Sequence, residues 1–167
     1  MSSRNISRAR HCPEPLGDRA VEAAEHEAHG EALSKAGFSK ASLRAYQKAA
    51  AIHVEANDHA SAAKVFTNAA NRSGERGDYE ASNTFHGHAL DHHESAKDHA
   101  AAAKSYTVLA QNMTREGDHV AAKLLHSAAA ISYREAGDHK AAAISDAHRE
   151  KSMVKSWFQL KKTVIHK

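Results

Sequence analysis

The chain has 167 residues, a formal net charge of +3 at neutral pH, an isoelectric point near 9 and a single cysteine. The length suits one domain or one short repeat array, and no run approaches the roughly 18 apolar residues of a membrane-spanning helix. Because a lone cysteine excludes an intramolecular disulfide and the N-terminus lacks the apolar stretch of a secretory signal, the sequence predicts a cytoplasmic protein.

The positive charge is concentrated at the two ends of the chain. Residues 1–16, which contain both prolines, carry +2, residues 149–167 carry +5, and residues 17–148 carry −4. We expect the first 16 residues to form a flexible basic arm outside the folded region. A nucleic-acid-binding domain typically carries a basic stripe along its body, so the acidic body predicts that nucleic acid is not a partner.

A period of twenty residues runs through residues 17–148 without insertion. Most units begin with glycine followed by aspartate, and alanines come shortly after. The glycines on the first position are Gly17, Gly37, Gly77, Gly117 and Gly137, and the aspartates on the second are Asp18, Asp58, Asp78, Asp98, Asp118 and Asp138. Glycine closes the end of one helix in the left-handed conformation, and aspartate caps the start of the next. The sequence therefore predicts an all-α, antiparallel helical-hairpin repeat solenoid of about seven helices.

Units forty residues apart match better than neighbouring units. The string "AAKVFTNAAN" (62–71) aligns with "AAKSYTVLAQ" (102–111), which pairs Lys64 with Lys104 and Thr67 with Thr107. The structural repeat is therefore expected to be a hairpin of two non-equivalent helices.

The string "GDYEASNTFHGHAL" (77–90) resembles the opening of the second helix of a tetratricopeptide repeat. The tetratricopeptide unit has 34 residues and commonly a proline, whereas this unit has 40 and none. It is more similar to the longer repeats of soluble NSF attachment proteins. The resemblance covers roughly residues 37–148. It implies a solenoid that holds another protein, with the first helix of each hairpin lining a concave groove. If the string that begins at Gly77 opens a second helix, as the resemblance implies, the first helices start at Asp58, Asp98 and Asp138.

Two trios of polar residues recur at i, i+3, i+7 on the first helices, which places each trio on one helix face. They are Lys64, Thr67 and Asn71, and then Lys104, Thr107 and Gln111. Lysines suit a partner segment that carries carboxylates, while hydroxyl and amide groups can bond its backbone. The predicted function is thus non-enzymatic protein–protein interaction, with a segment of another protein as partner and no cofactor. The alternative is a solvated face that recurs because the hairpin was duplicated. Nothing in the sequence indicates an oligomeric state.

The 15 histidines raise a second reading, a His-rich helical protein that binds a metal or haem. His88 and His92, four residues apart, could chelate a transition metal from one helix face. No cysteine or HExxH motif joins them, so we expect solvated helix surface and no metal site. His86 and His126 occupy a repeat position that is aromatic elsewhere, and we expect them in the core. No nucleophile or phosphate-binding motif is present, so no enzymatic activity is predicted.

The C-terminal segment, residues 149–167, is basic and amphipathic. Its apolar residues Met153, Trp157, Leu160 and Val164 follow i, i+4, i+7, i+11. We expect this segment to form a helix whose apolar stripe docks on the preceding helix and caps the solenoid, as helical arrays require. Docking to an acidic partner and binding to an anionic membrane surface are the alternatives.

Overall fold

The computed structural model describes the backbone of residues 16–165 and the side chains of residues 17–161. Over this range the chain forms seven α-helices and no strand. They are α1 (Leu16–Lys35), α2 (Ser39–Glu55), α3 (His59–Glu75), α4 (Tyr79–Ser95), α5 (His99–Glu116), α6 (His119–Glu135) and α7 (His139–Ile165). The predicted all-α class and helix number are confirmed. The predicted N-terminal arm lies outside the described residues, apart from Leu16, where α1 begins.

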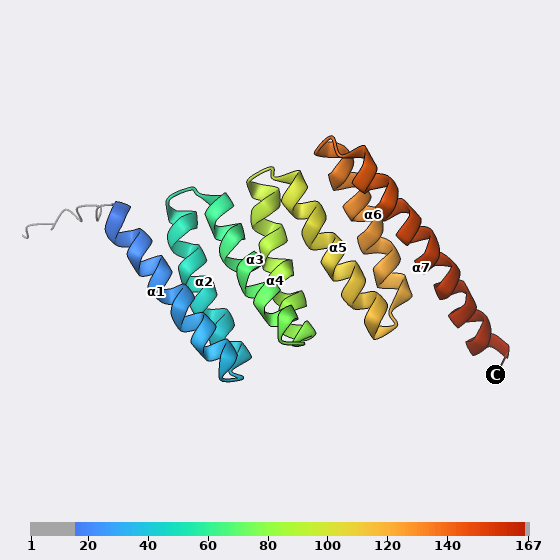
Figure 1. Ribbon diagram of the computed structural model, residues 1–167, viewed down its shortest axis with the longest axis horizontal. Helices are drawn as coiled ribbons and strands as arrows, with labels where there is room; N and C mark the ends of the chain where they lie inside the picture. The colour runs from blue at the N-terminus through green and yellow to red at the C-terminus, as the bar shows by residue number, and fades with distance from the viewer. Residues whose placement is uncertain (1–15, 166–167) are drawn as a thin grey trace, which may run out of the picture.

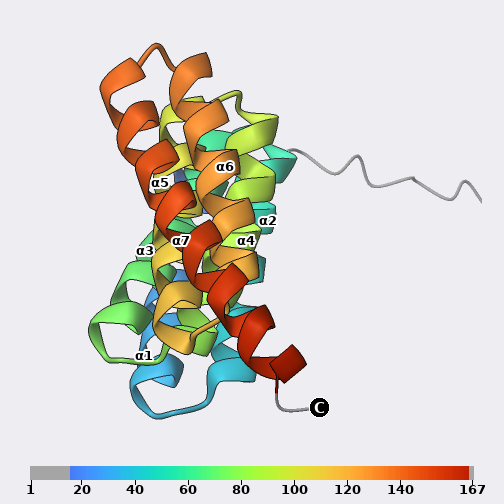
Figure 2. The same ribbon diagram turned by 90° about the vertical axis from the view of Figure 1, so that its right-hand side faces the viewer.

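The helices stand side by side in chain order and alternate in direction, so that successive turns lie at opposite ends of the array (Figure 1). Seen from the C-terminal side, α1, α3, α5 and α7 form one layer and α2, α4 and α6 form the other (Figure 2). Contacts within the pairs α1–α2, α3–α4 and α5–α6 are more extensive than those of α2–α3 and α4–α5. Up to α6 these contacts agree with the hairpin repeat expected from the sequence, whose first helices include α3 and α5. The α6–α7 contacts depart from this alternation, because they are as extensive as those within the pairs.

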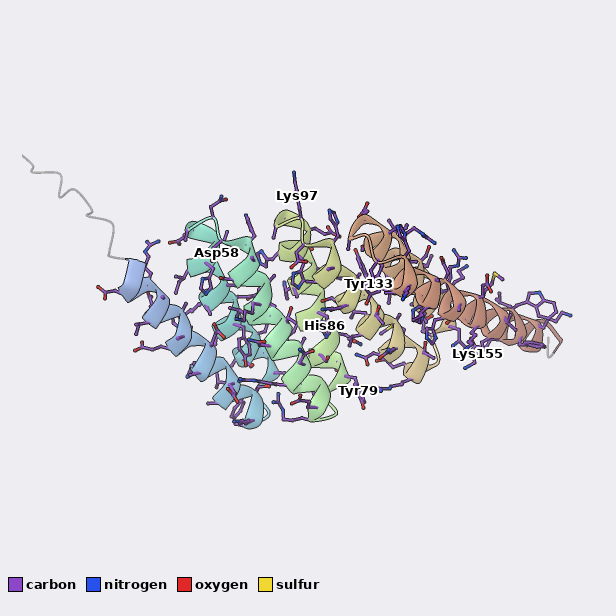
Figure 3. All side chains as sticks on the ribbon, turned by 45° about the horizontal axis from the view of Figure 1, so that its top comes forward. Asp58, Tyr79, His86, Lys97, Tyr133 and Lys155 are labelled. Atoms are coloured by element: carbon purple, nitrogen blue, oxygen red, sulfur yellow. The ribbon has the colours of Figure 1, made fainter. Side chains whose placement is uncertain are left out.

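The turns between helices have the chemistry that the repeat predicts. Gly37, Gly77, Gly117 and Gly137 all have φ between +79° and +84°. The two units without glycine hold Asn57 and Lys97 at φ 58° and 56°, so the backbone requirement persists where the residue changes. Lys97 projects outward from its turn (Figure 3).

Aspartate caps five of the seven helices. The side chains of Asp58, Asp78, Asp98, Asp118 and Asp138 each accept a hydrogen bond of 2.9–3.0 Å from the backbone N–H three residues later. The prediction is wrong at the first unit, because Gly17 and Asp18 lie inside the first turn of α1 instead of in a turn between helices. Helix α2 follows Phe38, whose side chain forms no cap.

The core is built from alanines and a few aromatic rings. Tyr46 and Phe85 meet edge to face with ring centroids 5.3 Å apart. The repeat position predicted to be aromatic is buried in four helices, where it holds Tyr46, Phe66, His86 and His126. The expectation that the two histidines replace core aromatics is confirmed. Figure 3 shows His86 in the middle of the array.

The C-terminal segment is helical through Ile165, as predicted, but it is the continuation of α7 and packs through a different face. Ala142, Ser145, Ser152 and Ser156 are buried. Met153, Trp157 and Leu160 are 51–61% exposed, so the prediction that this stripe docks is wrong; Val164 lies outside the described side chains. Helix α6 presents Ala122, Ala129, Ala130 and Ser132, a surface that small residues of a second helix can approach closely. Among the described side chains, the one stacked pair between the two helices is His126 of α6 and His148 of α7, with ring centroids 5.2 Å apart.

Candidate functional site

A cavity of about 470 Å³ lies between α3 and α5, with α4 as its floor. Helix α3 contributes Lys64, Thr67 and Asn71, which form one complete predicted trio, and α5 contributes Lys104. The other two predicted residues, Thr107 and Gln111, do not line it. We call this cavity and the residues around it the α3/α5 groove.

The second trio is split, although Thr107 forms the same intrahelical hydrogen bond as Thr67. Each hydroxyl donates to the carbonyl oxygen four residues earlier, at 2.9 Å. The side that α5 turns to the groove instead carries Ala101, Lys104 and Val108. All three residues of the trio on α3 therefore line the groove, whereas only Lys104 of the trio on α5 does.

The rim of the groove is cationic. Lys64 and Lys104 occupy equivalent positions of successive hairpins, and both side chains are exposed. Among the described residues neither ammonium group forms a salt bridge, so both charges are available to a partner. The carboxylate of Asp98 also lines the groove, but its Oδ1 accepts from the N–H of Ala101 at 3.0 Å. That acid therefore serves as the N-cap of α5.

The floor of the groove holds two buried histidines of α4. His93 Nε2 lies 3.1 Å from the hydroxyl oxygen of Thr67, and this hydroxyl donates to the carbonyl of Ala63. A hydroxyl has one proton, so Thr67 accepts from His93 and the proton of the neutral ring sits on Nε2. His93 Nδ1 and both nitrogens of His86 are buried without a hydrogen-bond partner among the described residues.

Burial keeps both imidazoles of the floor uncharged at neutral pH. Burial, together with a smaller effect of the neighbouring His93, lowers the pKa of His86 from 6.5 to about 4. Burial also lowers the pKa of His93, against a smaller raising effect of Asp98. The groove thus combines a positive rim with an uncharged, buried floor.

Sequence reasoning missed His93, because its place in the groove depends on a hydrogen bond to another helix. The spacing of the histidines in α4 could have indicated its position. His86 and His93 are seven residues apart, which puts them on one face of a helix. Combined with the hairpin repeat, that face is the one that α4 turns toward α3 and α5.

The histidines considered for a metal site lie on another face of α4. His88 and His92 both stack on the ring of Phe66, with centroids 5.1 and 5.7 Å apart from it. The ring of His59 stacks on His92 in turn, at 5.9 Å. In the part of the chain that the structure describes, no group of three or more His, Cys, Asp or Glu side chains could hold a metal ion.

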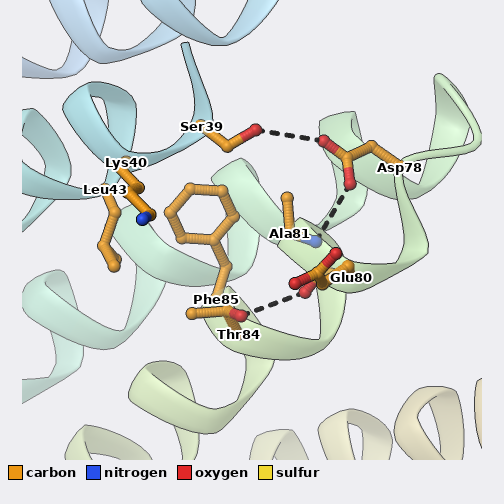
Figure 4. A pocket seen from close by; sticks show the side chains of 8 residues that line it. All are labelled: Ser39, Lys40, Leu43, Asp78, Glu80, Ala81, Thr84 and Phe85. Carbon is orange, nitrogen blue, oxygen red and sulfur yellow. Dashed lines mark hydrogen bonds between the residues drawn. The ribbon is translucent and has the colours of Figure 1, made fainter. Parts of the chain in front are cut away.

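A second, smaller hollow of about 280 Å³ lies between α2 and α4, with the ring of Phe85 among its lining side chains (Figure 4). Its polar groups are already engaged. Asp78 caps α4 through the N–H of Ala81 and lies 3.4 Å from the hydroxyl of Ser39. One lysine, Lys40, lines it together with two acids, so it lacks the paired cations of the α3/α5 groove.

The fold and the groove define the protein as an all-α helical-repeat solenoid with a cationic groove between first helices of successive hairpins. No protein-family model matches the chain. No curated protein sequence matches it either. Among the described residues, no helix combines the length and the apolar character that crossing a bilayer requires.

Proposed function

We propose that this protein is a non-enzymatic interaction module of the tetratricopeptide-like type, which binds an extended acidic segment of another protein in the α3/α5 groove. The observation that carries the proposal is the pair of exposed lysines, Lys64 and Lys104, on either side of one cavity. Such a module acts in the cytoplasm, in keeping with the single cysteine of the chain.

The lysines select for acidic residues more than they supply affinity. An exposed ion pair contributes up to about 1 kcal/mol, so two such pairs alone hold a partner weakly. Further binding energy comes from apolar contact with Ala60, Ala101 and Val108 along the walls. The side-chain amide of Asn71 adds hydrogen-bond donors and a hydrogen-bond acceptor that can pair with the backbone of an extended segment.

The floor of the groove does not offer hydrogen bonds to a partner. His86 is only 2% exposed and both of its ring nitrogens are buried, so a bound segment cannot reach them. Polar contacts with a partner come from the rim and the walls, and the preferred partner has carboxylates at the rim.

The test is selection of a displayed random peptide library on the immobilised full chain, followed by affinity measurements with the selected peptides. We expect enrichment of Asp and Glu, and binding that weakens with salt. The double variant Lys64→Glu, Lys104→Glu should fold normally and lose these peptides. The matched control Lys48→Glu, Lys140→Glu has the same change in charge outside the groove and should retain them. Equal binding by both double variants would place the site elsewhere.

A further inference from the structure

In the C-terminal half of α7, small polar side chains are buried and large apolar side chains are exposed, the reverse of an ordinary helix on a water-soluble domain. Its inward residues Ser152 and Ser156 are small and polar, yet they are buried. Its large apolar residues Met153, Val154, Trp157 and Phe158 are 50–56% exposed. A helix of a globular protein normally turns its apolar face to the core, so these four side chains form a surface that the solenoid itself leaves uncovered. We call them, together with Lys151, Lys155 and Lys161, the α7 outer face.

The register of α7 against α6 shows how this surface is presented. Gln159 Nε2 donates to the carbonyl oxygen of Gly117 at 3.1 Å, in the turn that precedes α6. The helix continues to Ile165, so its last residues run past the start of α6. Figures 1 and 2 show α7 as the outermost helix, with its C-terminal end at one extremity of the array. The α7 outer face is therefore accessible to a large flat object.

The charges on this surface are mainly positive. Every charged residue from 151 to 165 is a lysine, and the nearest acid on the same face is the exposed Glu150, one turn before Met153 and Val154. Successive residues of an α-helix are turned by about 100° around the helix axis. The four apolar residues Met153, Trp157, Val154 and Phe158 therefore span an arc of about 140° around α7. Lys151 and Lys155 lie next to this arc, on one side of it. Lys161 lies within the arc, with its Nζ 3.9 Å from the centroid of the Trp157 ring.

We propose that the α7 outer face binds the surface of an anionic lipid bilayer, with the helix lying in the plane of the membrane. Tryptophan, phenylalanine and methionine on one side with lysine beside them is the composition of interfacial helices. The long lysine side chains let their ammonium groups reach lipid phosphates while the stems lie along apolar surface. From the sequence alone, a C-terminal helix docked on the solenoid was preferred over a helix that binds a membrane. The exposure of Trp157 reverses this preference.

Other occupants fit the surface less well. In a second copy of the chain, pairing of the two outer faces would bring the lysines of both copies together, which is unfavourable. An acidic protein would satisfy the lysines, but it would have to cover an aromatic and aliphatic arc of about 140° that carries no acceptor for a hydrogen bond. A bilayer offers anionic phosphates and hydrocarbon at adjacent depths, which matches both parts of the surface.

The test uses the full chain and phosphatidylcholine vesicles with or without phosphatidylserine. We expect the protein to float with the anionic vesicles only. Emission of Trp157, the single tryptophan, should shift to the blue on their addition.

Each of the variants Lys151→Glu and Lys155→Glu should weaken partition into anionic vesicles about fivefold or more. The pair Trp157→Ser, Phe158→Ser should abolish it while leaving circular dichroism and the melting temperature unchanged, because both side chains are exposed.

The matched control is Leu124→Ser, Ile131→Ser, which removes two equally exposed apolar residues from α6 and should leave partition unchanged. The groove variant Lys64→Glu, Lys104→Glu should also float normally, so this proposal and the peptide-binding function fail independently. Three results would overturn the membrane proposal. They are no flotation with anionic vesicles, equal flotation of the Trp157→Ser, Phe158→Ser pair, and a blue shift that appears without vesicles as the protein dimerises in sedimentation velocity.

Discussion

The hydroxyl of Thr67 on α3 accepts a hydrogen bond from His93 Nε2 on α4, at 3.1 Å, and so joins a wall of the α3/α5 groove to its floor. His93 is only 6% exposed, so water cannot replace this acceptor at little cost. We expect Thr67→Val to lower the free energy of unfolding by about 2 kcal/mol, because the ring N–H is left buried and unpaired. Thr67→Ser keeps the hydroxyl and should cost much less. Urea denaturation of both variants measures the difference, and equal losses would mean that the hydrogen bond contributes nothing beyond packing.

The buried His86 makes stability depend on pH. Its pKa is about 4 in the folded protein and 6.5 in the unfolded chain. Between these values the unfolded chain binds a proton at this ring that the folded chain does not. The stability present above pH 6.5 is therefore lost as the pH falls toward 4, by about 3 kcal/mol for this group. Burial lowers the pKa of His126 as well, which adds a loss of the same sign.

The variant His86→Phe isolates this effect, because Phe66 shows that a phenylalanine fits the equivalent position of the repeat. Unfolding by denaturant, followed at several pH values from 7.5 to 4, should show a flatter dependence for the variant than for the wild type. Parallel curves would mean that His86 has the same pKa in the folded and the unfolded states, contrary to its burial.

The aspartates that cap helices should contribute more to the free energy of unfolding than other exposed aspartates do. Asp118 Oδ1 accepts from the N–H of Ala121 at 2.9 Å, and the residue lies outside the groove. Asp118→Ala should lower stability by about 1 kcal/mol through loss of the cap. Asp91, exposed within α4, provides the comparison, and its replacement by alanine should have a much smaller effect. Thermal melts with equal shifts for both variants would contradict the role assigned to the repeat position.

Lys97 occupies a backbone position that glycine takes in four other turns. Its φ of 56° is unfavourable for a residue with a Cβ. Lys97→Gly should therefore raise the free energy of unfolding, by about 1 kcal/mol. The same change at Lys48, an exposed residue within α2, should lower it by a similar amount. A loss of stability at both sites would show that the left-handed conformation at Lys97 carries no strain.

The turns, the number of helices and part of the groove were predictable from the sequence because their causes are local or repeated. In the turns between helices, a left-handed residue followed by a capping aspartate ends one helix and starts the next, and Asp98 and Gly117 follow that rule. Lys64 and Lys104 come to the same groove because equivalent residues of successive hairpins lie at equivalent places.

The outward orientation of Trp157 and the groove position of His93 were not predictable in the same way. The face that α7 buries is set by how closely it approaches the alanine-rich surface of α6, so Ser152 and Ser156 are buried and the larger residues are not. The place of His93 depends on Thr67, which is 26 residues away in the chain and on another helix. The spacing of His86 and His93 indicates only that they share a face of α4. The hydrogen bond to Thr67 and the face that α7 buries leave no periodic signal, because each depends on the fit between two particular surfaces.

The most direct test of the proposed function is mapping of amide chemical shifts on the full chain by NMR, during titration with an acidic peptide selected as described above. We predict that the largest changes fall on Lys64, Thr67 and Asn71 of α3, His93 of α4 and Lys104 of α5, which meet only in the α3/α5 groove. Changes confined to α1, α2, α6 or α7, with these five residues unaffected, would contradict the assignment of the groove as the binding site.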